Sequence, residues 1–167
     1  MINKYIAYYD SPIGKIRITA DEDSITTLYF ILEMDGIELE PMLINEPLEK
    51  CLEQLDLYFK GELREFDLKL NPSGTEFQKK VWNEVLKIPY GKTKSYLELS
   101  QMLGNEKSIR AVARANGENK IAIIIPCHRV VGSDKSLTGY AAGIWRKKWL
   151  LDHEAAVVSN ERQLSLF

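Results

Sequence analysis

The apolar residues of this chain change their spacing near residue 72, and that change constrains the fold more than any other feature. Before it, apolar and polar residues alternate in short runs, which is typical of half-buried strands. After it, apolar residues recur at helical spacing. The segment NPSG, residues 71–74, separates the two patterns and is rich in loop-forming residues. We therefore expect two domains, residues 1–72 and 73–154, followed by a flexible tail at residues 155–167.

The first domain is expected to be a small antiparallel sheet with one helix. The expected strands are KYIAYYD, GKIRITA and SITTLYFI, with a last strand in FDLKLNPSG. After Pro47 the apolar residues recur at helical spacing, and they are Leu48, Leu52, Leu55 and Phe59. Cys51 lies on the same apolar face, so we expect it to be a core residue.

The second domain is expected to consist of short helices with clear start signals. Thr75 with Gln78, and Ser95 with Glu98, have the form of capping boxes. The expected helices are TEFQKKVWNEVLKI, SYLELSQML and SIRAVARAN, followed by a closing helix in IWRKKWLLDHE. This order favours a helix-turn-helix with SIRAVARAN in the recognition position, whereas an ordinary helical hairpin packed for stability is the alternative.

Charge is divided unevenly between the two halves of the chain. Residues 1–75 carry a net charge of −8 and residues 76–167 a net charge of +6. A basic half is expected for a partner that is a polyanion, but a surface that merely complements the acidic half would look the same. No apolar run is long enough for a membrane span, and no signal peptide is evident. We therefore expect a cytoplasmic protein whose cysteines remain thiols.

The segment IAIIIPCHRVVG, residues 121–132, places Cys127 and His128 directly after a run of aliphatic residues. We expect that run to be a buried strand. The adjacent pair by itself allows a nucleophile, a metal ligand or a core thiol. Zinc is disfavoured because the cysteines and histidines, including His153, lack the paired spacing of zinc ligands. We expect no metal and no cofactor.

PCHRV, together with IPYGKTKSY upstream and LTGYAAGIWRKKWLLDHE downstream, resembles the O6-alkylguanine-DNA alkyltransferases. The resemblance spans about residues 75–154, and the first domain resembles that family in position, strand content and YYDSPIG. The resemblance implies an α/β (α+β) fold, with an N-terminal ribonuclease H-like domain and a C-terminal winged-helix-like domain. It also implies stoichiometric transfer of an alkyl group to Cys127 from O6 of guanine in double-stranded DNA, and it raises O4 of thymine as a second position. A winged-helix protein that only binds DNA is the alternative.

The resemblance assigns roles in the chemistry to five residues. Cys127 is the acceptor, and His128 is the base that takes its proton. Adjacent side chains of a strand point to opposite faces, so direct contact requires a turn after Pro126 or a bridging water, and the resemblance favours the water. Glu154 orients the histidine. Tyr96 donates a proton to the purine ring, and Lys147 is a cation near O6, although a lysine within RKK is by default solvated.

Other residues are expected to hold the DNA and the flipped base. Ala111, Ala113 and Ala115 give the third helix a smooth face, which would allow close approach to a minor groove. Arg110 matches the arginine that fills the gap left by the base. The remaining expected DNA contacts are Asn105, Tyr96, Ala111 and Ser133. The expected pocket and hinge residues are Asn119, Arg129, Val130 and Tyr140. Ala142 stands where the family commonly has glycine, which would narrow the pocket for bulky alkyl groups.

The last residues, QLSLF, resemble the short peptide by which bacterial replication and repair proteins bind the DNA sliding clamp. The residues concerned are Gln163, Leu164, Leu166 and Phe167. The alternative is that these apolar side chains fold back on the protein's own surface. Apart from this partner and DNA, we expect a monomer.

Overall fold

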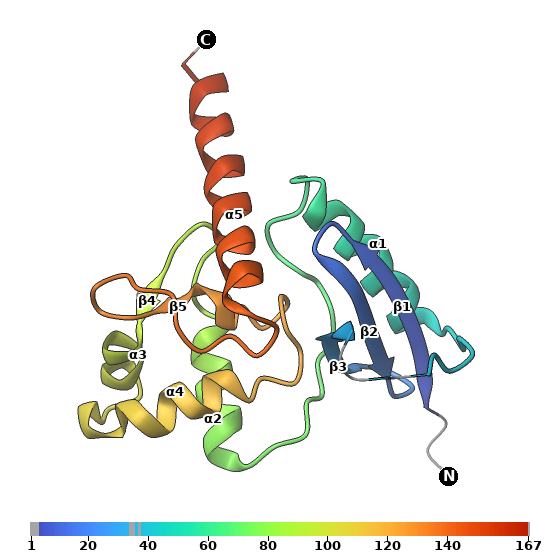
Figure 1. Ribbon diagram of the computed structural model, residues 1–167, viewed down its shortest axis with the longest axis horizontal. Helices are drawn as coiled ribbons and strands as arrows, with labels where there is room; N and C mark the ends of the chain where they lie inside the picture. The colour runs from blue at the N-terminus through green and yellow to red at the C-terminus, as the bar shows by residue number, and fades with distance from the viewer. Residues whose placement is uncertain (1–3, 34–35, 37, 167) are drawn as a thin grey trace. The chain divides into compact units, whose positions relative to one another are not determined.

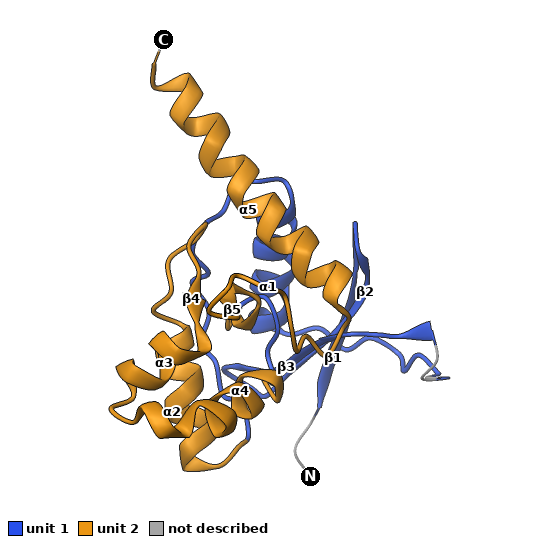
Figure 2. Ribbon diagram, turned by 60° about the vertical axis from the view of Figure 1, so that its left-hand side comes forward, with its two compact units in different colours: residues 1–73, 120–124 blue, residues 74–119, 125–167 orange. Residues whose placement is uncertain are grey.

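The computed structural model describes residues 4–33, 36 and 38–166, and the chain divides into two compact units (Figure 2). The first unit contains residues 1–73 and 120–124, and the second contains residues 74–119 and 125–167. A small sheet with a helix forms the first unit, and most of the second unit is helical (Figure 1). The expected mixed α/β fold with a sheet domain and a helical domain is confirmed.

The sheet of the first unit follows from the alternation in the sequence. Its strands β1 (Tyr5–Ser11), β2 (Gly14–Ala20) and β3 (Ile25–Phe30) are antiparallel in that order. Alternating side chains such as Ile16 and Ile18 are fully buried, as one face of a covered sheet requires. These three strands were predicted correctly.

Helix α1 (Glu46–Phe59) belongs to the first unit and is capped by Asn45, which accepts a hydrogen bond from the Leu48 amide. Its buried side chains are Leu48, Cys51, Leu55 and Tyr58. The prediction that Cys51 is a core residue is therefore confirmed. Its thiol is fully buried, and burial raises its pKa to about 12.

Two expected strands are not formed as such. In FDLKL only Leu70 pairs, through an isolated bridge to Ile25. In the aliphatic run 121–125, Ile121 bridges to Leu28, but the following residues turn and Ile123 has a φ of 70°. The prediction of a buried strand there was wrong, although its isoleucines are buried as expected. A short apolar run indicates burial more reliably than it indicates strand geometry.

The second unit contains the expected helix-turn-helix. Capping boxes at Thr75 and Ser95 start helices α2 (Glu76–Val85) and α3 (Tyr96–Met102), as predicted. A 3-10 turn, η2 (Glu106–Ser108), leads into α4 (Ile109–Gly117). The buried Trp82 indole donates to the Ala115 carbonyl at 2.9 Å and so ties α2 to α4. Strands β4 (Lys94–Ser95) and β5 (Val130–Val131) form a short parallel pair in the same unit.

Helix α5 (Ile144–Leu164) continues well beyond residue 154, where the sequence analysis places a flexible tail. The segment 155–164 contains no glycine or proline to end a helix, which explains the extension. The Gly91 backbone packs so closely on this segment that a Cβ there would lie 2.7 Å from the Val158 side chain. Among the described residues, no helix has the length and apolar character needed to cross a membrane.

Candidate active site

The chain turns at Cys127, and this turn decides where the adjacent histidine lies. Pro126 precedes a 3-10 turn, η3 (Cys127–Arg129), closed by a 2.9 Å bond from the Arg129 amide to the Pro126 carbonyl. The expected turn after Pro126 is therefore present, but no hydrogen bond joins the two side chains among the described residues. Cys127 is 6% exposed and His128 is fully buried.

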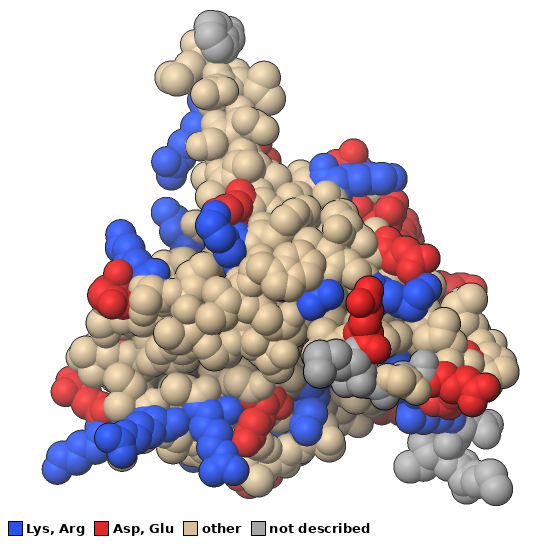
Figure 3. Space-filling view, viewed as in Figure 1, with Lys and Arg blue, Asp and Glu red and all other residues tan. Residues whose placement is uncertain are grey.

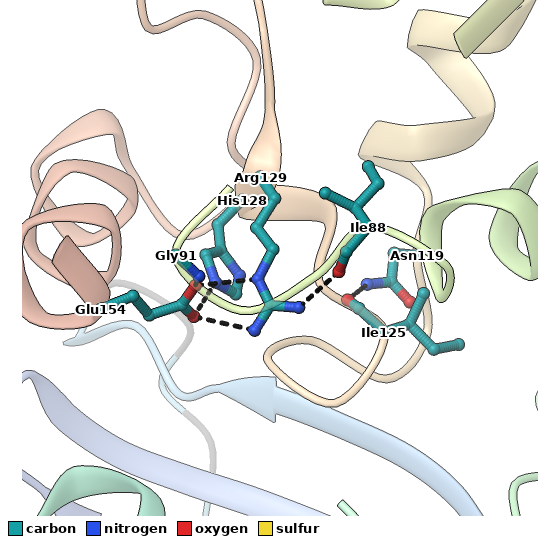
Figure 4. Close-up of polar contacts among 7 residues, drawn as sticks. All are labelled: Ile88, Gly91, Asn119, Ile125, His128, Arg129 and Glu154. Carbon is teal, nitrogen blue, oxygen red and sulfur yellow. Dashed lines mark hydrogen bonds and ion pairs between the residues drawn. The ribbon is translucent and has the colours of Figure 1, made fainter. Parts of the chain in front are cut away.

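The carboxylate of Glu154 is fully buried and surrounded by donors (Figure 4). His128 Nε2 lies 2.7 Å from Oε2, and the Arg129 guanidinium donates to both oxygens, at 2.8 Å and 3.2 Å. The amide of Gly91 donates to Oε1 at 3.2 Å. Burial raises the pKa of Glu154, but His128 and Arg129 outweigh it and hold the pKa far below its usual range. Glu154 is therefore a fixed anion.

This anion determines which nitrogen of His128 carries the proton. Because an ionised carboxylate only accepts hydrogen bonds, Nε2 carries the hydrogen that lies between the two groups. Nδ1 then holds the free electron pair, and this buried atom has no hydrogen-bond partner among the described residues. Burial lowers the pKa of His128, and Glu154 offsets only part of that effect. The imidazole is thus a neutral base with its acceptor nitrogen available.

The thiol of Cys127 lies among groups that favour its ionised form. Burial raises the pKa of Cys127, but a hydrogen bond from Asn119 and the nearby charge of Lys147 act in the opposite direction. Asn119 also donates to the Ile125 carbonyl at 2.8 Å (Figure 4), so it joins the end of α4 to the reactive turn. The hinge role expected for Asn119 stays a prediction.

Lys147 is fully buried in the active site, although it stands within RKK. Its ammonium donates to the carbonyls of Val130 and Thr138, at 2.6 Å and 2.9 Å, and lies 3.4 Å from the Tyr96 hydroxyl. Burial lowers the pKa of Lys147 to about 8, while the charge of Cys127 acts the other way. Tyr96 donates to the Thr138 carbonyl at 3.0 Å, so two of the expected residues, Tyr96 and Lys147, meet at one carbonyl.

The expected pocket residues divide into two groups. Val130 is buried beside the site, and Tyr140 has a buried hydroxyl with no partner among the described residues. Burial raises the pKa of Tyr140 well above its usual value. The Arg129 side chain, by contrast, is directed to Glu154 and not to the expected pocket. Its guanidinium binds the Glu154 carboxylate and donates to the Ile88 carbonyl at 2.8 Å (Figure 4).

The expected DNA contacts lie on the outside of the helix-turn-helix. Asn105, Arg110, Ala111 and Ser133 are all exposed. Lys and Arg atoms gather in the region that α4 and its connection to α3 occupy in this view (Figure 3). The smooth face differs from the expectation in one respect, because Ala115 packs inward beside Val112 and Asn116 while Ala111 faces outward. A helix turns about 100° per residue, so Ala113 lies on the opposite side from Ala111 and Ala115, and the three alanines cannot form one face.

Sequence reasoning missed two polar contributors to the site. Gly91 supplies an amide to Glu154 from a turn with a φ of 72°, and the only sequence signal is the PYG turn itself. Asn116 is 1% exposed and donates to the Cys127 carbonyl at 3.2 Å. Its position on the inner face of an amphipathic helix was a signal that could have been followed. Within the described residues, no group of three His, Cys, Asp or Glu side chains could hold a metal ion.

A buried thiol, a neutral histidine and a fixed carboxylate on a helix-turn-helix scaffold define a cysteine nucleophile in a unit with the form of a DNA-binding domain. Residues 76–156 match the 6-O-methylguanine DNA methyltransferase, DNA binding domain, and residues 4–72 match the ribonuclease-like domain of the same family. The chain belongs to the 6-O-methylguanine DNA methyltransferase family.

Named relatives and solved structures agree with this assignment along nearly the whole chain. The methylated-DNA--protein-cysteine methyltransferase of Methanosarcina acetivorans is 46% identical over 154 residues, which cover 91% of this chain and 99% of the relative. The Mycobacterium tuberculosis protein of that name is 45% identical over 147 residues, covering 87% and 88%. The crystal structure of Mycobacterium tuberculosis OGT in complex with DNA is similar with a TM-score of 0.82 at 41% identity, covering 92% and 94%.

Proposed function

We propose that this protein repairs DNA by direct transfer of a methyl or small alkyl group from O6 of guanine to Cys127. The observation that carries the proposal is the buried thiol next to a histidine whose Nε2 is bound by Glu154 and whose Nδ1 has no partner within the described part of the chain. Family membership supplies the reaction, and the named relatives are methylated-DNA--protein-cysteine methyltransferases.

The first step is ionisation of the Cys127 thiol. His128 takes the thiol proton through Nδ1, with one water molecule as the bridge, and Glu154 stabilises the imidazolium that forms. Arg129 and the Gly91 amide keep the carboxylate in place for this role. The buried ammonium of Lys147 stabilises the thiolate by charge.

The second step is attack of the sulfur on the alkyl carbon. The carbon–sulfur bond forms while the carbon–O6 bond breaks, and its electron pair remains on guanine. Tyr96 gives a proton to the ring so that neutral guanine leaves, and Lys147, 3.4 Å from that hydroxyl, supports the developing charge. The product thioether resists hydrolysis, so each molecule repairs one lesion.

Access to O6 requires that the base leave the duplex. The exposed Arg110 at the start of α4 fills the gap, while Asn105, Ala111 and Ser133 contact the strand around it. Tyr140, Val130 and Asn119 surround the extruded base and the reactive turn. We infer a monomer that acts in the cytoplasm, where DNA is present and thiols remain reduced.

A titration with a defined O6-methylguanine duplex tests this function. The chain should consume one equivalent of lesion and then stop. Cys127→Ala should remove all transfer, and Cys51→Ala is the matched control that should retain it. Transfer that continues past one equivalent, or that survives Cys127→Ala, would overturn the proposal.

We further propose that the C-terminal residues bind a bacterial DNA sliding clamp. Gln163 and Leu164 end α5, and Leu164 and Leu166 are 75% and 82% exposed, which supports a docking peptide over a tail folded back on the protein. Phe167 lies outside the described residues. An extended peptide needs the last helical turn to open, and backbone bonds such as Ser165 N to Glu161 O, 3.0 Å, would have to break for this.

Clamp binding is tested by calorimetry with purified clamp. Burial of three large apolar side chains, less the cost of ordering the peptide, gives a dissociation constant on the order of micromolar. Leu164→Ala with Leu166→Ala should abolish binding and leave methyl transfer on short duplexes unchanged. Asn160→Ala with Glu161→Ala on the same helix is the control. Absence of binding by the full chain at tens of micromolar, roughly the limit set by that energy, would refute this partner.

A further inference from the structure

The turn from Tyr140 to Gly143 carries an expected wall of the base pocket and leads directly into α5. The Gly143 amide donates to the Tyr140 carbonyl at 2.9 Å, which closes the turn. Gly143 is the residue before α5, and it has a φ of 100° and no side chain that could cap the helix. The entry into α5 therefore depends on contacts other than a capping side chain.

Trp145 and Arg146, at the start of α5, both contact this turn. Nη1 of Arg146 donates to the Ala142 carbonyl at 2.7 Å. The Arg146 guanidinium also lies over the Trp145 ring, 4.3 Å from its centroid. The Trp145 ring lies against Gly143, because a Cβ there would be 3.3 Å from Cδ1 of the ring. The Trp145–Arg146 pair therefore holds the turn through a hydrogen bond and a packing contact.

The exposure of this pair argues against a mainly structural role. Trp145 is 56% exposed, so its ring buries much less apolar surface than Trp82, which is 1% exposed. A hydrogen bond from a charged donor, by contrast, is directional and restricts where the accepting carbonyl lies. The Trp145–Arg146 pair is better suited to fixing the position of the turn than to stabilising the core.

Tyr140 relates the turn to the reactive thiol. Its hydroxyl is buried. Burial raises the pKa of Tyr140 most, the nearby charge of Cys127 raises it further, and the charge of Arg146 lowers it. These interactions place the hydroxyl near both the thiol and the guanidinium. A displacement of the turn would therefore move a side chain that lies close to the reactive sulfur.

We propose that Arg146, stacked on Trp145, is a positioning residue that holds the Tyr140–Gly143 turn against the extruded base and so sets how tightly the base is bound. The inference rests on the proposed transfer to Cys127, in which Tyr140 is one of the residues around the base. The groups that ionise the thiol have other partners, since His128 is bound by Glu154. Loss of the Arg146 contact should therefore weaken binding of the base without displacing the histidine.

Binding of the extruded base is measured in the full chain carrying Cys127→Ala, which cannot accept the methyl group. Dissociation constants are determined for an O6-methylguanine duplex and for the same duplex without the lesion, and their ratio is the lesion preference. Undamaged DNA reports the contacts to the strand, whereas the lesion preference reports the contacts to the base. Arg146→Ala should lower the lesion preference by about tenfold, the effect of one hydrogen bond from a charged donor, and leave the affinity for undamaged duplex unchanged.

Three further variants in the same background separate positioning from other roles. Arg146→Lys keeps a charged donor and should retain most of the lesion preference. Trp145→Ala removes the stacking partner of the guanidinium and should lower the lesion preference by about threefold. Lys148→Ala removes an exposed cation from the same helix, and it is the control that should change neither affinity.

Equal losses of affinity for the two duplexes in Arg146→Ala would show that Arg146 contacts phosphate or supports the fold, and would overturn the inference. An unchanged lesion preference in Arg146→Ala would overturn it as well. If Arg146→Ala does not fold, the lesion preference of Trp145→Ala decides in the same way, because that ring is more than half exposed. Methyl transfer by the chain with Cys127 intact is measured in parallel, because its absence would instead refute the proposed function.

Discussion

Replacing Glu154 by glutamine should destabilise the second unit strongly, because the carboxylate is the counter-ion of a buried guanidinium. Arg129 has a side chain that is 8% exposed, and in Glu154→Gln its charge loses its anionic partner. Removing one member of a buried ion pair costs about 3–5 kcal/mol. A neutral amide also cannot replace a carboxylate that accepts from His128, Arg129 and Gly91 together.

Asp152→Asn is the matched control on the same helix. Asp152 is ion-paired with Lys148 at 2.5 Å, but both side chains are about two-thirds exposed, at 65% and 66%. An exposed pair of this kind contributes about 0–1 kcal/mol. The two substitutions therefore remove the same charge from α5 in opposite environments.

Thermal melting followed by tryptophan fluorescence measures this difference in the relevant unit. All three tryptophans, Trp82, Trp145 and Trp149, lie in the second unit. We expect Glu154→Gln to lower the melting temperature by roughly 10 °C or more and Asp152→Asn by no more than about 3 °C. Equal shifts for the two variants would refute the argument that Glu154 is a buried counter-ion.

The same comparison has an expected pH dependence. The pKa of Glu154 is lower in the folded chain than its ordinary value of 4.5, so its stabilisation is present above that value and is lost as the pH falls through the folded pKa. The gap between wild type and Glu154→Gln should therefore be constant from about pH 7 to 8 and should narrow only in strong acid, below about pH 4. A gap that disappears near neutral pH would contradict an ionised, paired Glu154.

Three further outcomes are expected. The transfer rate of the wild type should fall above about pH 8, because the buried Lys147 loses its proton there. Lys147→Arg should move this fall in rate to higher pH. Lys147→Met should lower the rate at pH 7 and remove the fall in rate above pH 8. Arg110→Ala should slow repair of duplex DNA by about tenfold or more and leave the reaction with a free alkylguanine base unchanged. Arg114→Ala breaks an exposed ion pair with Glu118 and should change neither rate by much. Cys51→Ala should leave the initial transfer rate unchanged, because the Cys51 thiol is buried and its pKa is raised to about 12. A loss of transfer equal to that in Cys127→Ala would contradict an inert Cys51.

Local signals in the sequence predicted the elements that depend on local interactions. The capping boxes at Thr75 and Ser95 form as expected, since a cap is a contact between residues three positions apart. The strands of the first unit follow from alternation, and Cys51 lies in the core as the helical spacing indicates. Cys127, His128 and Glu154, by contrast, were assigned by resemblance. His128 and Glu154 are 26 residues apart, so no local sequence pattern predicts their contact.

Features set by tertiary contacts were not predictable in this way. The setting RKK predicts a solvated Lys147, and its burial depends on distant partners, the carbonyls of Val130 and Thr138 and the Tyr96 hydroxyl. Arg129 was assigned to the pocket and hinge group by resemblance, yet its guanidinium binds Glu154 on a helix distant in the sequence. The aliphatic run before Pro126 indicated burial correctly, but the turn at Ile123 depends on packing that a single apolar run does not encode.

The most direct test of the central claim is peptide mass mapping after the full chain reacts with an O6-methylguanine duplex. The account predicts one added methyl group per molecule, on the peptide that contains Cys127, with Cys51 unmodified. Methyl on Cys51, methyl on another residue, or loss of the lesion with no modified peptide would contradict it.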